Sequence, residues 1–569
     1  MLSGYKVSGR WEFPKFDLRW IALLAILLAG LYLRSANLGR AEFSHDELLH
    51  YYAAKSLIEH GQPQLPSGQS YRRAYFTTLA VAAVFKLLGE SKFAARLPSA
   101  IFGAASILLI FYVGAKLFNP TVGVISALFW AFYPQSVALS RSARMYAEHE
   151  VLYLFMVYAL YRGLEAPQVR STFYVLRSTF DVRWLAVAAV FFALAWQLQV
   201  LTATVGLALI AYSAAMLIVI SFQKRSLAVL FTPWRTKYGL ILGSSLLAGA
   251  GAFIFYGPLF FKLIEPISKP LSWWTSQWAN DPRYYHYLLS KLYPAMWLLF
   301  PAICLAACMR AGKRSLFLAI NFIVPLALMS ISAQKEERYI LHIMPLFMLL
   351  SAVAAEAVIT ISLRKLYIGL RKQSLKPALA RATAIFLILV VSLFFIRFSP
   401  WFIISKRLPD TVEGPGYFGD AYWRQACQYV KERMKPGDII VTEFMATHVH
   451  YYLGRIDYII YNPPPAVVAQ ETKRDSEGWD RELYFGARLI NSVEQLERLA
   501  EQNQRIWLIL SNEYWELTTS EPIRAYVTEK MTLQEPMTDY HFKVYLFLRP
   551  TSVRPTSTMR STLKIERRT

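Results

Sequence analysis

The sequence is poor in charged residues and in cysteine, and both shortages narrow the class of protein. Only 17% of the 569 residues are charged and 55% are hydrophobic, a balance that excludes an ordinary soluble domain. Of the three cysteines, Cys304 and Cys308 lie one turn apart in an apolar run and Cys427 is isolated, so we expect no disulfide framework. Because no small-residue cleavage site follows the first apolar run, we do not expect that run to be a cleavable signal peptide.

Long uncharged runs recur along the first two thirds of the chain. Each of the stronger runs is long enough to cross about 30 Å of hydrocarbon, and one is long enough to cross twice. With four weaker candidates, the predicted spans lie at residues 20–33, 97–115, 117–140, 145–161, 184–223 (two spans), 238–261, 292–309, 315–334, 339–363 and 382–398. We therefore expect a polytopic α-helical membrane protein with about eleven transmembrane helices.

The formal charge of +23 follows a topological pattern that argues against a nucleic-acid partner. Lysine and arginine cluster before the first span and then on alternate loops, which is the positive-inside pattern. This pattern predicts a multi-pass protein of the plasma (inner) membrane with its N-terminus in the cytoplasm. With an odd number of spans, the chain after Phe398 is then expected outside.

The composition becomes that of a soluble domain after the last predicted span. Helical and strand-like segments alternate between residues 400 and 550, which predicts a small extracytoplasmic α/β domain after a membrane domain of residues 1–399. The 400–550 segment has no glycine-rich phosphate loop, no metal-ligand spacing and no nucleophile elbow, so its sequence predicts no function. Residues 551–569 are rich in Ser, Thr, Arg and Pro and are expected to be disordered.

The first outer loop, residues 34–96, is long and carries an acidic pair, Asp46 and Glu47. A carboxylate at the edge of a membrane cavity can take the proton of an incoming hydroxyl, so Asp46 and Glu47 are candidate catalytic residues. The alternative is an ordinary acidic helix start, since Asp and Glu are favoured in a first turn. The apolar segment 74–88 is expected to be a helix in the membrane interface, because making it a span would place Lys116 outside.

A second charged constellation lies at the start of the predicted span 145–161. Arg144 and Glu148 are costly there, and a buried structural ion pair between them is the alternative to a functional role. Asp46, Glu47 and Glu148 together offer oxygen ligands for a divalent metal. No Asp-x-Asp pair supports a metal, so no metal and no cofactor is the favoured expectation.

The loop length, acidic pair and topology resemble the glycosyltransferase C superfamily, most closely the bacterial relatives of protein O-mannosyltransferases and lipid A aminoarabinose transferases. The resemblance covers about residues 20–350, and its first 150 residues are the most specific. Its patches are residues 43–51, Gly61 with Pro63, residues 72–78, 88–99, 144–146 and 335–345. The step at 72–78 departs from the superfamily pattern, because arginines stand where the relatives have lysine.

This resemblance implies transfer of a sugar from a polyprenyl-phosphate donor to a hydroxyl of a lipid, glycan or protein acceptor on the outer face, with inversion. Asp46 would be the base, and Glu47 would orient Asp46 or bind sugar hydroxyls. Arginine suits the departing lipid phosphate because it can make two parallel contacts. The implied substrate-binding residues are His45, Tyr51, Arg72, Arg73, Arg144, Tyr146, Glu148, Lys335, Arg338 and Tyr339. Alternatively, the cations contact lipid headgroups, or Lys335 pairs with Glu336 or Glu337.

Three rival functions stay open at this point. A multipass transporter of a lipid-linked or small polar substrate would place its charges mid-span and show repeats, whereas these charges cluster in outer loops. An oligosaccharyltransferase would carry Trp-Trp-Asp in a soluble C-terminal domain, whereas Trp273-Trp274 precedes Thr275 between spans. A non-catalytic anchor would present residues 400–550, which show no recognisable site.

Overall fold

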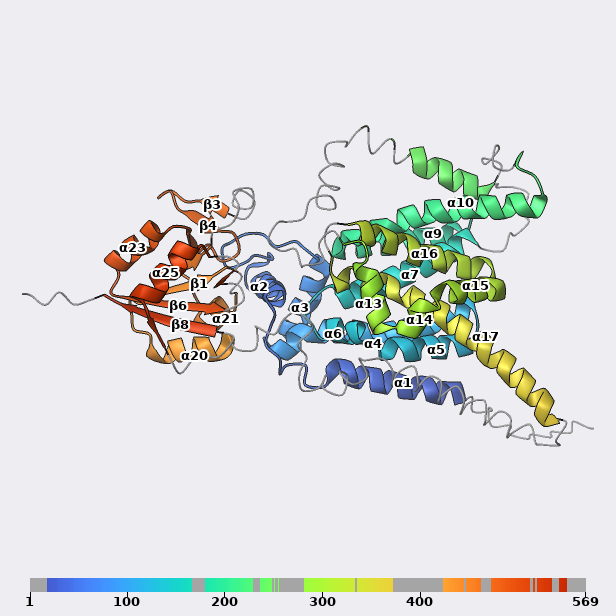
Figure 1. The fold of residues 1–569 in the computed structure, drawn as a ribbon, viewed down its shortest axis with the longest axis horizontal. Coiled ribbons are helices and arrows are strands. Elements are labelled where there is room, and N and C mark those ends of the chain that lie inside the picture. The colour runs from blue at the N-terminus through green and yellow to red at the C-terminus, as the bar shows by residue number, and fades with distance from the viewer. Residues whose placement is uncertain are drawn as a thin grey trace, which may run out of the picture. The chain divides into compact units, whose positions relative to one another are not determined.

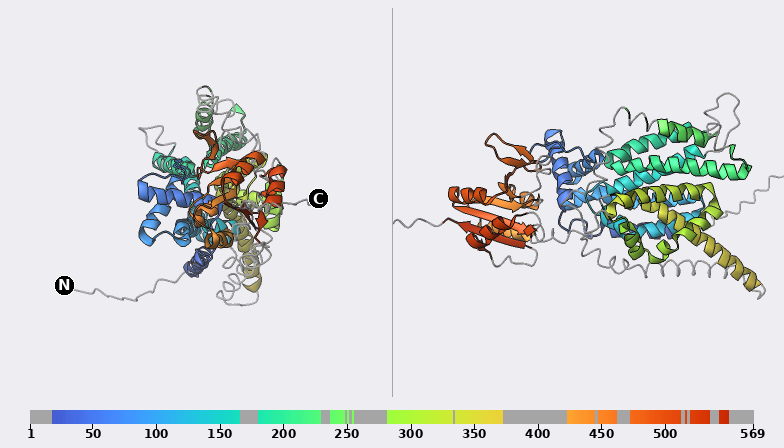
Figure 2. Two further views of the ribbon diagram at one scale, coloured as in Figure 1. Left: turned by 90° about the vertical axis from the view of Figure 1, so that its left-hand side faces the viewer. Right: turned by 45° about the horizontal axis from the view of Figure 1, so that its top comes forward.

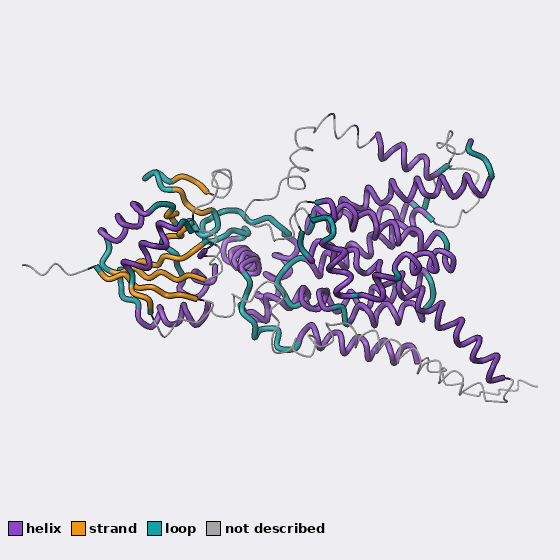
Figure 3. Tube along the Cα trace, viewed as in Figure 1, coloured by secondary structure: helices purple, strands orange, loops and turns teal. Residues whose placement is uncertain are grey.

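The structure is a computed structural model, and it describes residues 18–165, 180–228, 236–247, 250, 254, 281–332, 335–371, 423–444, 447–461, 472–511, 515–516, 519–534 and 542–549. The chain divides into two compact units. The first comprises Met1–Leu65 and Ser70–Phe418, and the second comprises Pro66–Gln69 and Gly419–Thr569. Figure 3 shows the strands of the described residues in the second unit and a bundle of helices in the first.

The first unit is helical. Its elements are α1 (Leu18–Ser35), α2 (His45–His60), α3 (Tyr75–Leu88), α4 (Lys92–Leu117), α5 (Pro120–Ala131), α6 (Pro134–Ser140), α7 (Tyr146–Leu164), α9 (Val182–Leu198), η1 (Val200–Ala203), α10 (Thr204–Lys224), α13 (Tyr284–Leu292), α14 (Pro294–Leu298), α15 (Phe300–Ala311), α16 (Lys313–Ile331), η3 (Glu337–Ile343) and α17 (Met344–Arg371). The bundle of α4, α5, α7, α16 and α17 forms one apolar core (Figure 1).

Five helical segments among the described residues are long and apolar enough to cross a membrane: Leu18–Ser35, Lys92–Leu117, Val200–Lys224, Lys313–Ile331 and Glu337–Ile361. A sixth is the pair α5 and α6, which is bent by 64°. The chain is thus a multi-span helical membrane protein. Three predicted spans within the described residues are not among these segments: 145–161 (α7), the first half of 184–223 (α9) and 292–309 (α15). The predicted span 382–398 and much of the span 238–261 lie outside the described residues, so the count of about eleven stays a prediction.

The bend between α5 and α6 places a polar segment beside residues 33–47. Arg34 is fully buried and donates to the carbonyls of Trp130 (3.4 Å) and Ala131 (3.0 Å), at the end of α5. Helix ends leave carbonyls without intrahelical partners, and the guanidinium pairs with these two; the Trp130 carbonyl also accepts the Tyr133 N–H at 3.2 Å. Pro134 then begins α6 at a position where a missing N–H costs nothing. The chain leaves α6 at Ser140 and reaches α7 through residues 141–145.

The segment 34–96 contains two helices, α2 and α3. A capping box begins α2, with Glu47 N–H donating to the Ser44 hydroxyl and Ser44 N–H donating to the Glu47 carboxylate. Gly61 ends α2 in the left-handed conformation, with φ of 74°. The apolar segment predicted at 74–88 is helix α3; its position in the membrane interface remains a prediction.

The second unit contains an eight-stranded mixed sheet in the order β3-β4-β5-β2-β1-β6-β8-β7. The strands are β1 (Ile439–Glu443), β2 (Tyr458–Ile460), β3 (Thr472–Arg474), β4 (Asp480–Glu482), β5 (Arg488–Ile490), β6 (Arg505–Ser511), β7 (Thr532–Leu533) and β8 (Phe542–Leu548). The neighbours β5, β2, β1 and β6 run parallel, and β6–β8, β7–β8 and the β3–β4–β5 pairings are antiparallel.

Helices pack on both faces of this sheet (Figure 2). Ile506 and Leu508 of β6 share a core with α23 (Val493–Gln502) and α25 (Glu521–Lys530). The alternate residue Trp507 shares a second core with α20 (Trp423–Arg433) and α21 (Thr447–Leu453). Successive side chains of a strand point to opposite faces, so β6 is apolar throughout because both faces are covered.

Candidate functional site

Three segments distant in the sequence meet at the Asp46 carboxylate. Asp46 lies in the first turn of α2, and its Oδ2 is 3.0 Å from Nη2 of Arg144, which precedes α7. Arg338 of η3 reaches the same oxygen, with 3.3 Å between Nη1 and Oδ2. Arg144 also donates to the backbone carbonyl of Asp46 at 3.2 Å. The fold thus brings together Asp46, Arg144 and Arg338, three of the residues predicted for the site.

The Tyr146 ring lies close to both guanidiniums. The centres of the Arg144 and Arg338 guanidiniums lie 5.6 Å and 6.0 Å from the ring centroid of Tyr146, and Arg338 lies 5.9 Å from that of Tyr339. A cation over an aromatic face is attracted by the ring quadrupole. Tyr146 and Tyr339 therefore help to hold the two arginines toward Asp46.

These cations decide the protonation state of Asp46. Burial raises the pKa of the Asp46 carboxyl, but the charges of Arg144 and Arg338, assisted by His45 and Arg73, outweigh it and hold the pKa well below its usual range. A quarter of the Asp46 side chain and a similar part of Arg338 are exposed, whereas Arg144 is buried. Asp46 is thus an accessible carboxylate, ionised at any physiological pH, in a field of excess positive charge.

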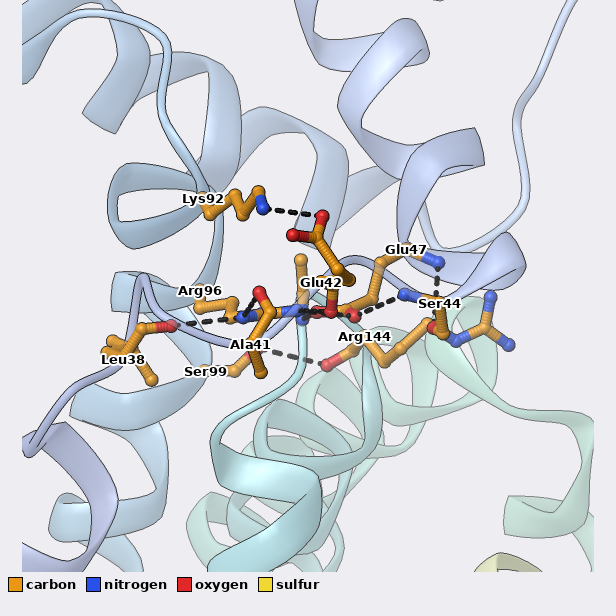
Figure 4. Close-up of polar contacts among 10 residues, drawn as sticks. Leu38, Ala41, Glu42, Ser44, Glu47, Lys92, Arg96, Ser99 and Arg144 are labelled. Carbon is orange, nitrogen blue, oxygen red and sulfur yellow. Dashed lines mark hydrogen bonds and ion pairs between the residues drawn. The ribbon is translucent and has the colours of Figure 1, made fainter. Parts of the chain in front are cut away.

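Glu47, in contrast, is enclosed (Figure 4). Its Oε1 and Oε2 accept from Nε (2.7 Å) and Nη2 (3.0 Å) of Arg96 on α4, a bidentate pair in which both side chains are buried. Glu47 Oε1 also accepts the N–H of Ala143 at 2.7 Å. Burial raises the pKa of Glu47, but Arg96 and these hydrogen bonds lower the pKa by more. Glu47 therefore fixes the backbone next to Arg144, and its carboxylate is fully occupied by protein groups.

The structure distributes the other predicted residues around this centre. His45 precedes Asp46, and the charges of His45 and Arg73 both act on it. Arg72 and Arg73 are exposed. Tyr51 is directed elsewhere, because its hydroxyl donates to Glu90 at 2.7 Å.

Two predicted residues have partners other than those expected. The Lys335 ammonium donates to the carbonyls of Met329 (3.1 Å), Ser330 (2.7 Å) and Ser332, so it caps the end of α16. The alternative of an ion pair between Arg144 and Glu148 is wrong, because Arg144 pairs with Asp46. Glu148 is buried, with its Oε1 3.2 Å from the Ser99 hydroxyl oxygen, and the single O–H of Ser99 can donate either to this carboxyl or to the Arg144 carbonyl at 3.0 Å.

No group of three or more His, Cys, Asp or Glu side chains that could hold a metal ion occurs within the described part of the chain. Asp46 and Glu47 point to different arginines, which explains why adjacent carboxylates do not converge with Glu148 on one ion. All three cysteines are free thiols.

Sequence reasoning missed Arg96, His50 and Tyr71, which line the same region. Arg96 lies within the segment 88–99 that carried part of the resemblance, and its position, one turn after Lys92 in a largely apolar helix, was a usable signal. His50 lies one turn after Asp46 on α2, on the same face. Tyr71 gave no signal, because its approach to α2 depends on the loop fold.

The comparisons with known proteins concern the family and the fold. Residues 73–234 match the family model described as dolichyl-phosphate-mannose-protein mannosyltransferase. The chain is similar to ArnT from Cupriavidus metallidurans, in a crystal structure bound to undecaprenyl phosphate, with a TM-score of 0.54 at 15% identity over 93% of this chain and 97% of that one. No curated protein matches the chain in sequence.

The chain is also similar to AglB, an archaeal oligosaccharyltransferase from Archaeoglobus fulgidus, in complex with an inhibitory peptide and a dolichol-phosphate. That match has a TM-score of 0.59 at 12% identity and covers 92% of this chain and 74% of that one. At such identities the likeness concerns the fold, and it extends over nearly the whole chain. The protein therefore has the fold of the glycosyltransferase C superfamily of membrane glycosyltransferases.

Proposed function

We propose that this protein transfers a sugar from a polyprenyl-phosphate donor to a hydroxyl acceptor, with Asp46 as the general base. The observation that carries the proposal is the partly exposed Asp46 carboxylate, held by arginines from two other segments in a glycosyltransferase C fold. ArnT was crystallised with undecaprenyl phosphate and AglB with a dolichol-phosphate, which supports a lipid-phosphate ligand here. The matches lend no support to the transporter alternative.

The positive charge around Asp46 exceeds what one carboxylate neutralises. Arg144, Arg338 and Arg73 act on Asp46, whereas Glu47 is neutralised by Arg96. A donor phosphate entering this region gains from the surplus, and Arg338 and Arg73 are accessible members that can form parallel hydrogen bonds to its oxygens. Arg338, Arg144 and Arg73 would thus form a cationic clamp for the phosphate. Lys335 is not part of this clamp, because its ammonium donates to the carbonyls at the end of α16.

The reaction then follows from one displacement. The acceptor hydroxyl gives its proton to Asp46 while its oxygen bonds to the anomeric carbon. The bond between that carbon and the phosphate oxygen breaks, and the electron pair leaves with the lipid phosphate. A single displacement inverts the anomeric configuration. The arginines offset the charge that develops on the leaving group, which is the electrostatic part of the catalysis.

Donor binding also prepares the base. The arginines that hold the pKa of Asp46 low make it a weak base in the free protein. A phosphate that pairs with Arg338 cancels part of this field, so the pKa of Asp46 rises and its proton affinity increases when the donor is present. The base is thus strongest in the complex that needs it.

The proposal includes the orientation inferred from charge. The N-terminus is cytoplasmic, whereas Asp46 and the 400–550 segment are on the outer side of the plasma (inner) membrane. The acceptor is a hydroxyl of a lipid, a glycan or a protein side chain.

The experiment that tests the proposal uses the purified protein in lipid vesicles. Polyprenyl-phosphate glucose and mannose are supplied with glycolipid, glycan and peptide acceptors, and both free polyprenyl phosphate and the glycosylated acceptor are measured. Transferase activity predicts equal amounts of the two products. Movement of intact sugar-lipid across the vesicle membrane without bond cleavage would support the transporter instead.

A further inference from the structure

His50 and Tyr71 form a polar pair that the proposed reaction does not use. His50 lies one turn after Asp46 on α2. The His50 imidazole is fully buried and the Tyr71 side chain is 8% exposed. Their rings meet edge to face, with centroids 5.3 Å apart at 86°. They come from different segments, since His50 lies in α2 and Tyr71 in the loop before α3.

Each residue is held in place by one hydrogen bond, and each has one other polar atom without a partner among the described residues. His50 Nδ1 is 3.3 Å from the Thr78 hydroxyl, which orients the ring, and Tyr71 N–H donates to the Pro63 carbonyl at 2.8 Å. His50 Nε2 and the Tyr71 hydroxyl have no hydrogen-bond partner within the described part of the chain. Buried polar atoms normally have partners, so two such atoms with no described partner, on side chains whose rings are in contact, indicate a ligand position.

Both groups belong to the Asp46 region electrostatically. The charges of Asp46, Arg144 and Arg73 act on His50 and on Tyr71 alike. Burial and the two arginines lower the pKa of His50 well below its usual value, and burial raises the pKa of Tyr71, so both are neutral at physiological pH. A neutral imidazole nitrogen and a phenol hydroxyl exchange hydrogen bonds with a hydroxyl group, which both donates and accepts.

We propose that His50 Nε2 and the Tyr71 hydroxyl form a subsite that binds a hydroxyl group of a sugar beside Asp46. The inference rests on the proposed function and names a sugar-binding position within its site. Arg144 and Arg73 disfavour an ammonium at this position, whereas a hydroxyl matches the two neutral hydrogen-bonding groups. A sugar hydroxyl satisfies both atoms. The sugar belongs either to the donor or to the acceptor.

Two substitutions at His50 and one at Tyr71 separate the subsite from the fold. His50→Asn keeps a polar atom near Nδ1 for Thr78 and removes Nε2, whereas His50→Gln places a polar atom near Nε2. Tyr71→Phe removes only a hydroxyl that has no described partner. The matched controls are His60→Asn, at the exposed end of α2, and Tyr429→Phe, in the second unit.

The test measures binding to the purified full-length protein in nanodiscs. The probes are polyprenyl phosphate alone, polyprenyl-phosphate glucose and mannose, and the acceptor-sugar mimics methyl glucoside and methyl mannoside. In His50→Asn and Tyr71→Phe we expect about threefold to tenfold weaker binding of one class of sugar probe, the usual effect of a lost hydrogen bond. Polyprenyl phosphate alone should bind as before, and His50→Gln should recover part of the loss.

The two classes of sugar probe distinguish the possible outcomes. Weaker binding of the sugar-phosphate lipids assigns the subsite to the donor, and weaker binding of the methyl glycosides assigns it to the acceptor. Unchanged binding of both classes in both variants would overturn the subsite. A wild-type protein that binds no polyprenyl phosphate would refute the proposed function, and the methyl glycosides would still decide whether the subsite exists.

Discussion

Arg144 and Asp46 form an ion pair of 3.0 Å although 98 residues separate them in the sequence. Arg338 shares the same carboxylate oxygen at 3.3 Å. Because the accessible Arg338 and the buried Arg144 meet at one atom, they are expected to contribute differently. In the proposed mechanism, Arg144 holds Asp46 in place, and Arg338 exchanges Asp46 for a donor phosphate.

Arg338→Ala should weaken donor binding and slow turnover together. A phosphate contacted in both the ground and the transition state raises the apparent Michaelis constant and lowers kcat when one contact is lost. Arg338→Lys should recover only part of the loss, because the forked geometry is missing. The measurement is steady-state kinetics with polyprenyl-phosphate sugar. Arg72→Ala is measured in the same way, because Arg72 was also predicted to bind the donor phosphate. Unaltered donor kinetics in Arg338→Ala would exclude the clamp.

The pH dependence of kcat/KM should reflect the effect of the nearby arginines on the pKa of Asp46. Its pKa is held low by cations that outweigh the effect of burial, so the base is ionised above that value and activity is lost only as the pH falls through it. Arg338→Gln removes one cation, which raises the pKa of Asp46 toward its usual value. The acid limb of the kcat/KM profile should therefore move to higher pH in Arg338→Gln. An acid limb that stays fixed would mean that another group sets it.

The Glu47–Arg96 pair should govern stability. Removing one partner leaves a buried charge uncompensated, so Glu47→Gln and Arg96→Ala should each lower the free energy of unfolding by about 3–5 kcal/mol. Thermal denaturation in detergent measures this. Lys530→Ala, which breaks an exposed pair with Glu529, should leave the transition unchanged. A Glu47→Gln protein of normal stability but without activity would indicate a direct catalytic role for Glu47.

Topology can be tested by cysteine labelling from outside sealed cells. After the native cysteines are replaced, a cysteine at Ser44 should react with an impermeant reagent, whereas one at Ser374 should not. Reaction at Ser374 but not at Ser44 would invert the orientation, and the proposed mechanism on the outer face would fail with it.

The sequence was sufficient for residues whose roles are local. The acidic helix start at Asp46 and Glu47, the arginine before the helix that begins at Tyr146 and the helix at 74–88 all follow from short-range patterns, and the fold places Asp46, Arg144 and Arg338 in one site. The glycosyltransferase C resemblance is confirmed at the level of the fold.

The sequence could not predict that Asp46 and Glu47 have different surroundings. Asp46 and Glu47 are adjacent, so only their surroundings distinguish a carboxylate open to substrate from one enclosed by Arg96 and the Ala143 N–H. Likewise, Lys335 looks like a phosphate ligand until the end of α16 places three carbonyls around it. These outcomes depend on tertiary contacts that no periodicity encodes.

The central claim is that Asp46 takes the acceptor proton, and Asp46→Asn tests it most directly. Asparagine keeps the shape but cannot act as a base, so sugar transfer by the purified variant should fall by about two to four decades, while binding of polyprenyl phosphate is retained. The retained binding shows that the site is folded. Transfer at a near wild-type rate by purified Asp46→Asn would contradict the account and remove Asp46 from the mechanism.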